Sequence, residues 1–250
     1  PLAADLIKPK DLVMLVVPID LAAPKGRLIL PQVQVLREVL DAGAMALTVK
    51  ESEVTDMLRG LAAKPALVIT DSQAVREVAA AVPEDIRLTT FSTLFARYKG
   101  DFAAQLAGAA AIDTLKDGDR VLIAEGCSHH VTCDDIGRVK IPNWMKKYTG
   151  RELKFEWTQG ADFPDNLEDY ALVVHCGGCM LNRAEVRRRI NECARQGVKV
   201  TNYGIVISKM QGVLERVVKG IADAGATGSV SDTGSISDTG SISDTGEESD

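Results

Sequence analysis

In the stretch Leu172-Val173-Val174-His175-Cys176-Gly177-Gly178-Cys179, a short apolar run passes directly into a Cys-x-x-Cys loop, a pattern that indicates a buried strand followed by a functional loop. The apolar run at residues 120–124 has the same form and is followed closely by Cys127. Short runs rich in β-branched residues and bounded by glycine are typical of buried parallel strands. Both cysteine segments are therefore expected at the carboxyl ends of strands.

Similar runs alternate with helical periodicity along most of the chain. We expect strands at residues 12–17, 46–49, 66–69, 87–90, 120–124, 154–157, 172–175 and 199–201, and helices at 32–40, 53–61, 72–82, 102–115, 183–196 and 203–218. This alternation predicts right-handed crossovers and sheets covered by helices. The expected fold is α/β, with two consecutive small α/β units of mainly parallel sheet flanked by helices, joined near residues 92–100, plus a disordered C-terminal tail.

The net charge of −6 is concentrated in that tail. Residues 221–250 hold seven acidic residues and no lysine or arginine, which leaves 28 acidic residues against 29 basic ones in residues 1–220. The hexapeptide Ser-Ile-Ser-Asp-Thr-Gly repeats at residues 235–240 and 241–246, a low-complexity pattern that favours disorder over a protease site. The remaining bases form no stripe, so nucleic acid is not an expected partner.

Composition also limits the compartment and the chemistry. No run approaches the roughly 18 to 20 apolar residues of a membrane helix, and the N-terminus lacks a secretory pattern, so no membrane association and a cytoplasmic location are expected. In a reducing compartment, five cysteines favour metal or redox chemistry over structural disulfides.

Cysteine and histidine gather in two groups, Cys127-Ser128-His129 and His175 to Cys179. Carboxyl ends of parallel strands lie at one edge of a sheet, so the two groups are expected to form one site. Zinc would accept three cysteines and one histidine, and a 4Fe-4S cluster would take three thiolates and leave one iron open. Spacing alone does not separate these metals. A thioredoxin-like dithiol is a third reading, which leaves Cys127 and His129 unexplained.

The two groups also match a known motif: Cys-x-His, a gap of some dozens of residues, then His-Cys-x-x-Cys. The gap here is 45 residues. With the stretches at residues 17–20, 23–32, 70–73, 97–101, 134–137 and 202–204, the chain resembles the HydF family of FeFe-hydrogenase maturation factors over about residues 5–220. The motifs occur together and in order, which makes the resemblance specific.

The resemblance implies a dimerisation domain at residues 5–95 and an iron-sulfur cluster-binding domain at 96–220, followed by the acidic low-complexity tail at 221–250. The family's GTPase domain is expected to be absent, because no G-x-x-x-x-G-K-[ST] phosphate loop occurs. The implied protein is not an enzyme but a homodimeric scaffold. It would carry a 4Fe-4S cluster, receive a diiron precursor made with radical-SAM maturases, and deliver it to apo FeFe-hydrogenase.

The resemblance implies that Cys127, Cys176 and Cys179 are cluster ligands, with His129 as a possible fourth ligand. A cluster held by three thiolates keeps one iron open, which suits a carrier, whereas a permanently closed cluster suits electron transfer. His175 is expected beside the ligands, orienting them. The alternative function is an iron-sulfur or dithiol redox protein.

Other polar residues near the motifs have simpler readings. We interpret Cys133 as a bystander thiol, Cys193 as a core residue, and His130 as pointing elsewhere. Asp134 and Asp135 are read as an oxygen ligand or a helix cap, and Asn202 and Tyr203 as a turn or a pocket lining. For Arg183, Arg187, Arg188 and Arg189 we favour a solvated helix face, and for Phe91, Phe95 and Tyr98 ordinary core packing.

Overall fold

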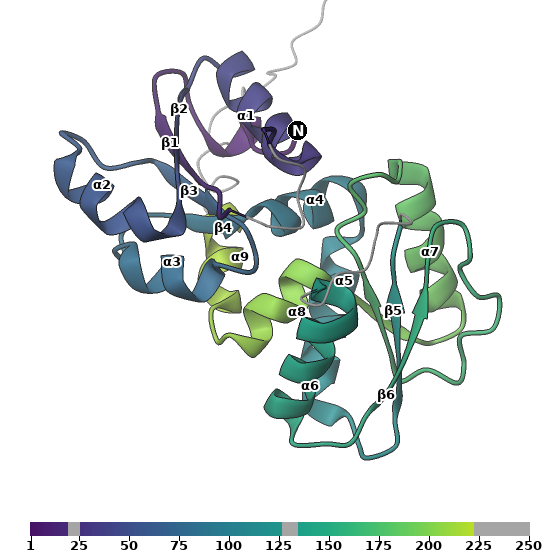
Figure 1. The fold of residues 1–250 in the computed structure, drawn as a ribbon. Helices are drawn as coiled ribbons and strands as arrows, with labels where there is room; N and C mark the ends of the chain where they lie inside the picture. Colours follow the sequence, from purple (N-terminus) through teal and green to yellow (C-terminus); the bar gives the residue numbers. More distant parts are fainter. Residues whose placement is uncertain (20–25, 127–134, 223–250) are drawn as a thin grey trace, which may run out of the picture.

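The computed structural model describes residues 1–19, 26–126 and 135–222, and these form two four-stranded parallel sheets with helices around them (Figure 1). The first sheet has the order β2-β1-β3-β4 and the second the order β6-β5-β7-β8. The strands are β1 (Leu12–Val16), β2 (Met45–Val49), β3 (Leu67–Thr70), β4 (Leu88–Thr90), β5 (Arg120–Ala124), β6 (Lys154–Thr158), β7 (Leu172–His175) and β8 (Lys199–Asn202). The predicted α/β class, with two parallel-sheet units, is confirmed, as are all eight predicted strands.

Nine α-helices are assigned within the described ranges. They are α1 (Leu30–Asp41), α2 (Val54–Gly60), α3 (Val75–Ala81), α4 (Phe91–Lys99), α5 (Phe102–Ala110), α6 (Ile141–Thr149), α7 (Arg183–Arg195), α8 (Tyr203–Met210) and α9 (Leu214–Ala222). Short 3₁₀ turns occupy Ala4–Leu6, Glu51–Glu53 and Ala111–Thr114, and a π-helical turn, Ile136–Lys140, leads into α6.

The helix predictions were wrong in three places. Helix α4, which lies at the expected join near residues 92–100, was not predicted; it begins directly after β4 because the Thr90 hydroxyl accepts the Thr93 N–H. Helix α6 was missed, although Pro142 in its first turn and Gly150 in the left-handed region after it are helix-boundary signals. The single helix expected at 203–218 is two helices, because Gly212 turns the chain with φ +74°.

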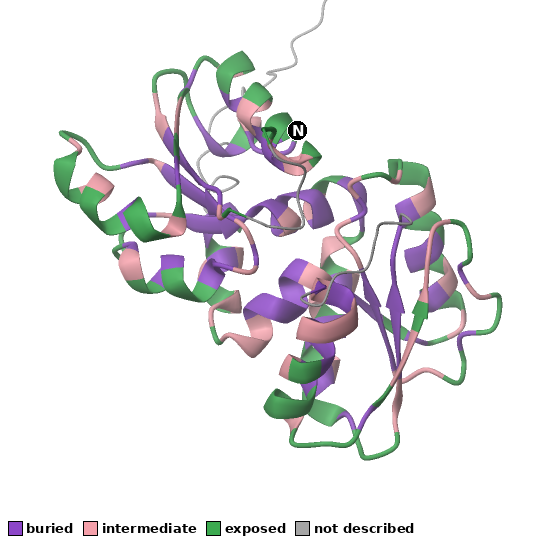
Figure 2. Ribbon diagram, in the orientation of Figure 1, coloured by how far each residue is buried: buried purple, intermediate pink, exposed green. Residues whose placement is uncertain are grey.

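The strands at the centre of each sheet are buried on both faces (Figure 2). Their side chains are mostly valine, leucine and isoleucine, as expected of a sheet that helices cover on two sides. Strand β2 lies at an edge, and Met45 there is 54% exposed. No helix in the described ranges is long and apolar enough to cross a membrane.

The last helix returns to the first sheet. A Cβ atom on Gly220 of α9 would lie 2.0 Å from the Leu88 carbonyl oxygen, so α9 sits directly on β4. Arg87 donates to the carbonyls of Gly220 and Leu6, and Arg216 donates to the carbonyls of Val82 and Pro83. The first sheet is therefore completed by residues that follow the second sheet in the chain.

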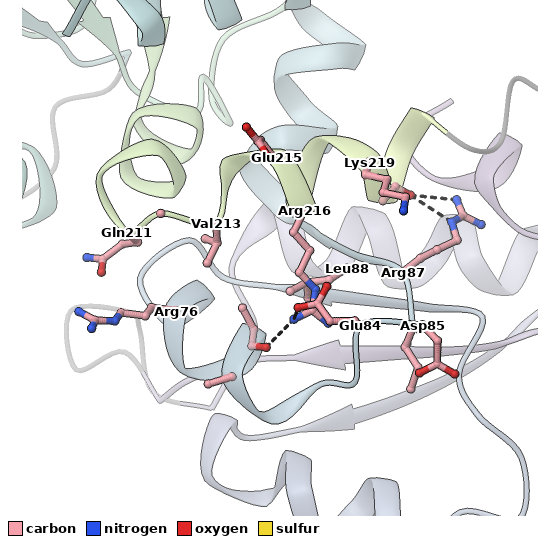
Figure 3. Close-up of a pocket in the computed structure, with 15 residues that line it drawn as sticks. Arg76, Glu84, Asp85, Arg87, Leu88, Gln211, Val213, Glu215, Arg216 and Lys219 are labelled. Carbon is pink, nitrogen blue, oxygen red and sulfur yellow. Dashed lines mark hydrogen bonds and ion pairs between the residues drawn. The ribbon is translucent and has the colours of Figure 1, made fainter. Parts of the chain in front are cut away.

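A hollow of about 720 Å³ lies where α3, the start of β4 and α9 meet (Figure 3). Its lining includes Arg87 and Arg216, whose guanidinium groups already donate hydrogen bonds to the backbone carbonyls named above. None of the described cysteines, Cys176, Cys179 and Cys193, lines it. This hollow is therefore separate from the site that the sequence predicts.

Candidate metal centre

The carboxyl ends of three neighbouring strands lie level in the second sheet. Ala124 of β5 pairs with His175 of β7, and His175 pairs with Asn202 of β8. Strands β5 and β7 are also where the strand order reverses, the place at which open parallel sheets form ligand sites. The loop between β7 and α7, residues 176–182, starts at this point and is called the cysteine loop below.

The cysteine loop touches the end of β5 through a sulfur atom. Cys176 Sγ accepts the backbone N–H of Gly126 at 3.0 Å and that of Gly178 at 3.4 Å. Gly126 is the last described residue before Cys127, and Cys127 and His129 lie outside the described residues. The described end of the β5 segment, Gly126, is therefore in contact with Cys176.

Within the described part of the chain, no group of three or more Cys, His, Asp or Glu side chains is arranged to hold a metal ion. Cys176 and Cys179 are both free thiols and both partly exposed. These two donors would need a third ligand from elsewhere to complete a metal site. The predicted ligand set therefore stays a prediction.

Burial controls the acidity of both thiols. It raises the pKa of Cys176 above its usual value, although the N–H groups of Gly178 and Gly126 act in the opposite direction. Burial also raises the pKa of Cys179, and the neighbouring Cys176 adds to this rise. Helix α7 begins after the cysteine loop, where Asn182 caps it by accepting the Glu185 N–H.

His175 is buried, and both of its ring nitrogens contact protein groups. Nδ1 lies 2.7 Å from the Cys176 carbonyl oxygen, so it must donate, and Nε2 then accepts from Arg189 Nη1 at 3.4 Å. Burial lowers the pKa of His175 to about 4, with Arg189 adding to the shift. The ring is therefore neutral at pH 7 and holds the first residue of the cysteine loop.

Arg189 is not on a solvated face, so that prediction was wrong for this residue. Its side chain is 2% exposed and donates to Glu185 at 2.7 Å and to the Gly160 carbonyl. The guanidinium also lies 5.1 Å from the centre of the Phe163 ring. Arg183, Arg187 and Arg188 are exposed as expected.

A second buried polar group lies on the β5 side of the site. The Glu125 carboxylate is 1% exposed and accepts from Arg138 at 3.3 Å, from Gln159 at 3.1 Å and from the Tyr203 hydroxyl at 3.5 Å. Burial raises the pKa of Tyr203 well above its usual value, and the neighbouring Cys176 and Glu125 add to the rise. Tyr203 therefore acts as a neutral hydrogen-bond donor at the edge of the site.

The helix-cap reading of Asp135 is correct, whereas Asn202, read as a turn or a pocket lining, is also a helix cap. Asp135 caps the π-helical turn, because its carboxylate accepts the Arg138 N–H at 2.8 Å. Asn202 caps α8 by accepting the Ile205 N–H at 2.8 Å, and it also donates to the Ser92 carbonyl at 3.2 Å. Cys133, His130 and Asp134 lie outside the described residues.

Lys99, at the end of α4, reaches the cysteine loop from the other half of the chain. Its Nζ donates to the carbonyl oxygens of Leu181 at 2.7 Å, Gly178 at 2.8 Å and Cys179 at 3.3 Å. Burial lowers the pKa of Lys99, whereas Cys179 and Cys176 act to raise it. Sequence reasoning missed this residue, and its only signal was its place in the motif at residues 97–101.

The aromatic residues at the join divide between core and surface. Phe91 and Phe95 are 3% and 2% exposed, so ordinary core packing is correct for them. Tyr98 is 40% exposed, so core packing was wrong there. Helical periodicity does not explain the difference, because Tyr98 lies seven residues after Phe91 and so on the same side of α4, next to the end of the helix.

Cys193 is the core residue that its helical position predicted. It is fully buried in α7, and burial raises its pKa to about 12. Because the thiolate is the reactive form, we expect iodoacetamide at pH 8 to modify Cys193 at least about 100-fold more slowly in the folded protein than in urea. Mass spectrometry of peptides after timed quenching measures this ratio. Equal rates in the two states would contradict the assigned burial.

Comparison with known proteins gives two family matches. A model described as the hydrogen maturase F dimerization domain matches residues 2–100, and one described as the hydrogen maturase F tetramerization domain matches residues 103–220. No curated protein matches the chain.

Two solved structures show a weak likeness. An NtrC family transcriptional regulator from Clostridium acetobutylicum is 11% identical, with 84% of this chain and 96% of that chain covered at a TM-score of 0.25. A putative LacI family repressor from Corynebacterium glutamicum is 12% identical, with 83% and 89% covered at a TM-score of 0.24. Neither likeness bears on fold or function. The two family matches span almost all of the described residues, and the chain therefore belongs to the HydF family of hydrogenase maturation proteins.

Proposed function

We propose that this chain is a scaffold for FeFe-hydrogenase maturation that binds a 4Fe-4S cluster through Cys127, Cys176 and Cys179. It would receive a diiron precursor made with radical-SAM maturases and deliver it to apo-hydrogenase. Membership of the HydF family supports the maturation role. The observation that carries the cluster assignment is the 3.0 Å hydrogen bond from Gly126 N–H to Cys176 Sγ, because the residue after Gly126 is Cys127.

The described donors fit such a cluster. Cys176 and Cys179 are unpaired thiols at a sheet switch point, and Cys176 already accepts two N–H groups, the kind of hydrogen bond that tunes cluster thiolates. When bound with three thiolates, the cluster supplies one iron with an open or exchangeable position. We assign His129 as a possible fourth ligand. His175 orients the loop instead, because both of its nitrogens contact protein groups.

The dithiol redox reading is weaker. A thioredoxin-like centre needs an accessible thiolate of low pKa as its nucleophile. Burial instead raises the pKa of both Cys176 and Cys179. This pattern suits thiols that ionise when they bind a metal better than thiols that attack a disulfide.

Self-association follows from the family, since its two matched domains are a dimerization and a tetramerization domain. We propose a homodimer that buries the open edge of the first sheet. Strand β2 lies at this edge with Met45 54% exposed, and α1 exposes Val33 by 44% and Leu40 by 54%. An open parallel edge beside apolar side chains favours pairing with a second copy.

Anaerobic reconstitution with iron and sulfide tests the proposed function. We expect a brown protein with about four iron atoms and four sulfides per chain. The variants Cys127→Ser, Cys176→Ser and Cys179→Ser should each reduce the cluster content at least about fivefold, since each variant lacks one of the three thiolates. Cys193→Ser is the matched control and should keep full content, because Cys193 is buried in α7.

Transfer is tested separately by mixing the loaded chain with apo-hydrogenase. Hydrogenase activity should appear only after the chain has also been loaded with the diiron precursor. A colourless, zinc-containing protein would refute the cluster, and activation by a chain carrying the 4Fe-4S cluster alone would refute the carrier role.

A further inference from the structure

Lys99 is a buried ammonium group that crosses from one half of the chain to the other. Residues 1–100 contain the first sheet and α4, and residues 101–222 contain the second sheet and the cysteine loop. Lys99 is the last residue of α4 and is only 9% exposed. Helix α4 lies between the first sheet and the second half (Figure 1).

The ammonium makes three hydrogen bonds, and all of them end on the cysteine loop. The acceptors are the carbonyl oxygens of Gly178, Cys179 and Leu181. An ammonium has three N–H groups, so these three carbonyls use all of its hydrogen-bond donors. Gly178 has φ +62°, a conformation that glycine adopts readily, and Lys99 bonds to its carbonyl. The loop backbone is thus folded around one side chain from the other half.

Within the described ranges, Lys99 makes no ion pair with a carboxylate, and its hydrogen bonds end on neutral carbonyl groups. Buried charges are usually paired, as Glu125 is with Arg138 and Arg189 is with Glu185. Its other contact is the Phe95 ring, whose centre lies 5.1 Å away. Carbonyl dipoles and an aromatic face solvate a cation without neutralising it. Negative charge gathered on Cys176 and Cys179 would supply the missing counter-charge.

We infer that Lys99 is a positioning residue for the cluster site: the first half of the chain supplies an ammonium that fixes the shape of the cysteine loop and balances the charge of its thiolates. Only the charge-balancing role rests on the proposed function. The first part concerns the loop backbone and applies to the metal-free chain. It follows that the packing of α4 and the occupancy of the cysteines favour one another.

The metal-free protein tests the loop-shaping role by hydrogen exchange. Lys99→Met keeps the length of the side chain and removes all three hydrogen bonds, so amide exchange across residues 177–182 should accelerate at least about tenfold. Lys140→Met is the matched control, because Lys140 also crosses between the halves but donates to the Gln73 side chain, at 2.7 Å. It should leave exchange in the cysteine loop unchanged.

Lys99→Arg separates charge from shape. Arginine keeps the positive charge, but its planar guanidinium cannot direct three N–H groups as an ammonium does. We expect exchange in this variant to stay faster than in the parent. Unchanged exchange in Lys99→Met, or equal acceleration in Lys140→Met, would overturn the loop-shaping role. If Lys99→Met does not fold, parental exchange in Lys99→Arg would overturn it.

The reconstituted protein tests the charge-balancing role through the midpoint potential of the cluster. Loss of a nearby cation favours the more positive, oxidised form, so Lys99→Met should shift the reduction equilibrium about tenfold, which is about 59 mV to lower potential for one electron. Lys99→Arg should stay close to the parent, and so should Lys140→Met. Equal potentials in Lys99→Met and the parent would overturn charge balancing. A parent that binds no cluster would refute the proposed function, while the metal-free exchange result would still decide the loop-shaping role.

Discussion

Replacement of Arg189 by methionine is expected to lower the free energy of unfolding by about 3 kcal/mol, because it leaves buried polar groups without partners. The Gly160 carbonyl and the His175 Nε2 atom both lose their donor, and Glu185 loses one of its two arginines. The apolar replacement offers no hydrogen bond in return. Urea denaturation of the metal-free chain, monitored by circular dichroism, measures the change.

Arg188→Met provides the control on the same helix. Arg188 also pairs with Glu185, at 2.7 Å, but its side chain is 54% exposed. An exposed ion pair contributes roughly 0 to 1 kcal/mol, so this variant should stay within that range of the parent. Equal losses in the two variants would show that burial does not distinguish these arginines.

Replacement of Gly108 by alanine is expected to cost about 2 to 3 kcal/mol, although alanine is normally the better helix former. A Cβ atom at this position of α5 would lie 2.0 Å from the Val200 oxygen and 2.4 Å from its carbonyl carbon. Backbone atoms of β8 cannot rotate away as a side chain can. Helix α5 would have to move off the strand that ends at Asn202, and the thermal midpoint should fall accordingly.

Gly60→Ala is expected to change stability in the opposite direction, because this site has room for a side chain. Gly60 is exposed at the end of α2, and a Cβ atom there would meet nothing within 4 Å. We expect this variant to be unchanged or stabilised by up to about 0.5 kcal/mol. Calorimetry of both variants separates the packing cost from helix propensity, and a destabilised Gly60→Ala would contradict this account.

The strands were predictable because burial on two faces leaves a strong local pattern. The runs at residues 120–124 and 172–175 need no knowledge of their neighbours to be read as strands. Their convergence was predictable too, since parallel strands place their carboxyl ends at one edge. The split between α8 and α9 was visible only as Gly212, and a lone glycine does not by itself show whether a helix ends.

The polar surroundings of the site were not predictable from local pattern. Arg188 and Arg189 are adjacent in sequence and similar in chemistry, yet one is exposed and the other buried, because β7 and the loop at Gly160 cover only one side of α7. Lys99 shows the same limit. Its hydrogen bonds join residues about 80 positions apart, and no periodicity within α4 indicates them.

The tertiary contacts of residues 97–101 explain why these residue types occur in the motif. Arg97 binds Asp5 and the Leu2 carbonyl, so it ties down the N-terminal segment. Asp101 caps α5 by accepting the Ala104 N–H. A Cβ atom at Gly100 would lie 2.9 Å from the Ala96 carbonyl oxygen, so the close approach favours glycine. The family resemblance marked this stretch, but only the fold assigns each residue a partner.

The return of α9 to β4 bears on how the protein is made. A ribosome releases residues 1–100 well before residues 214–222, so during synthesis Leu88 and its neighbours stay uncovered while the entire second sheet is being added. The carbonyls of Val82 and Pro83 likewise lack the hydrogen bonds from Arg216 until that residue has been made. Nascent chains of this protein therefore complete the first sheet only after residues 214–222 have been made, and a chain stopped before residue 214 leaves that sheet unfinished.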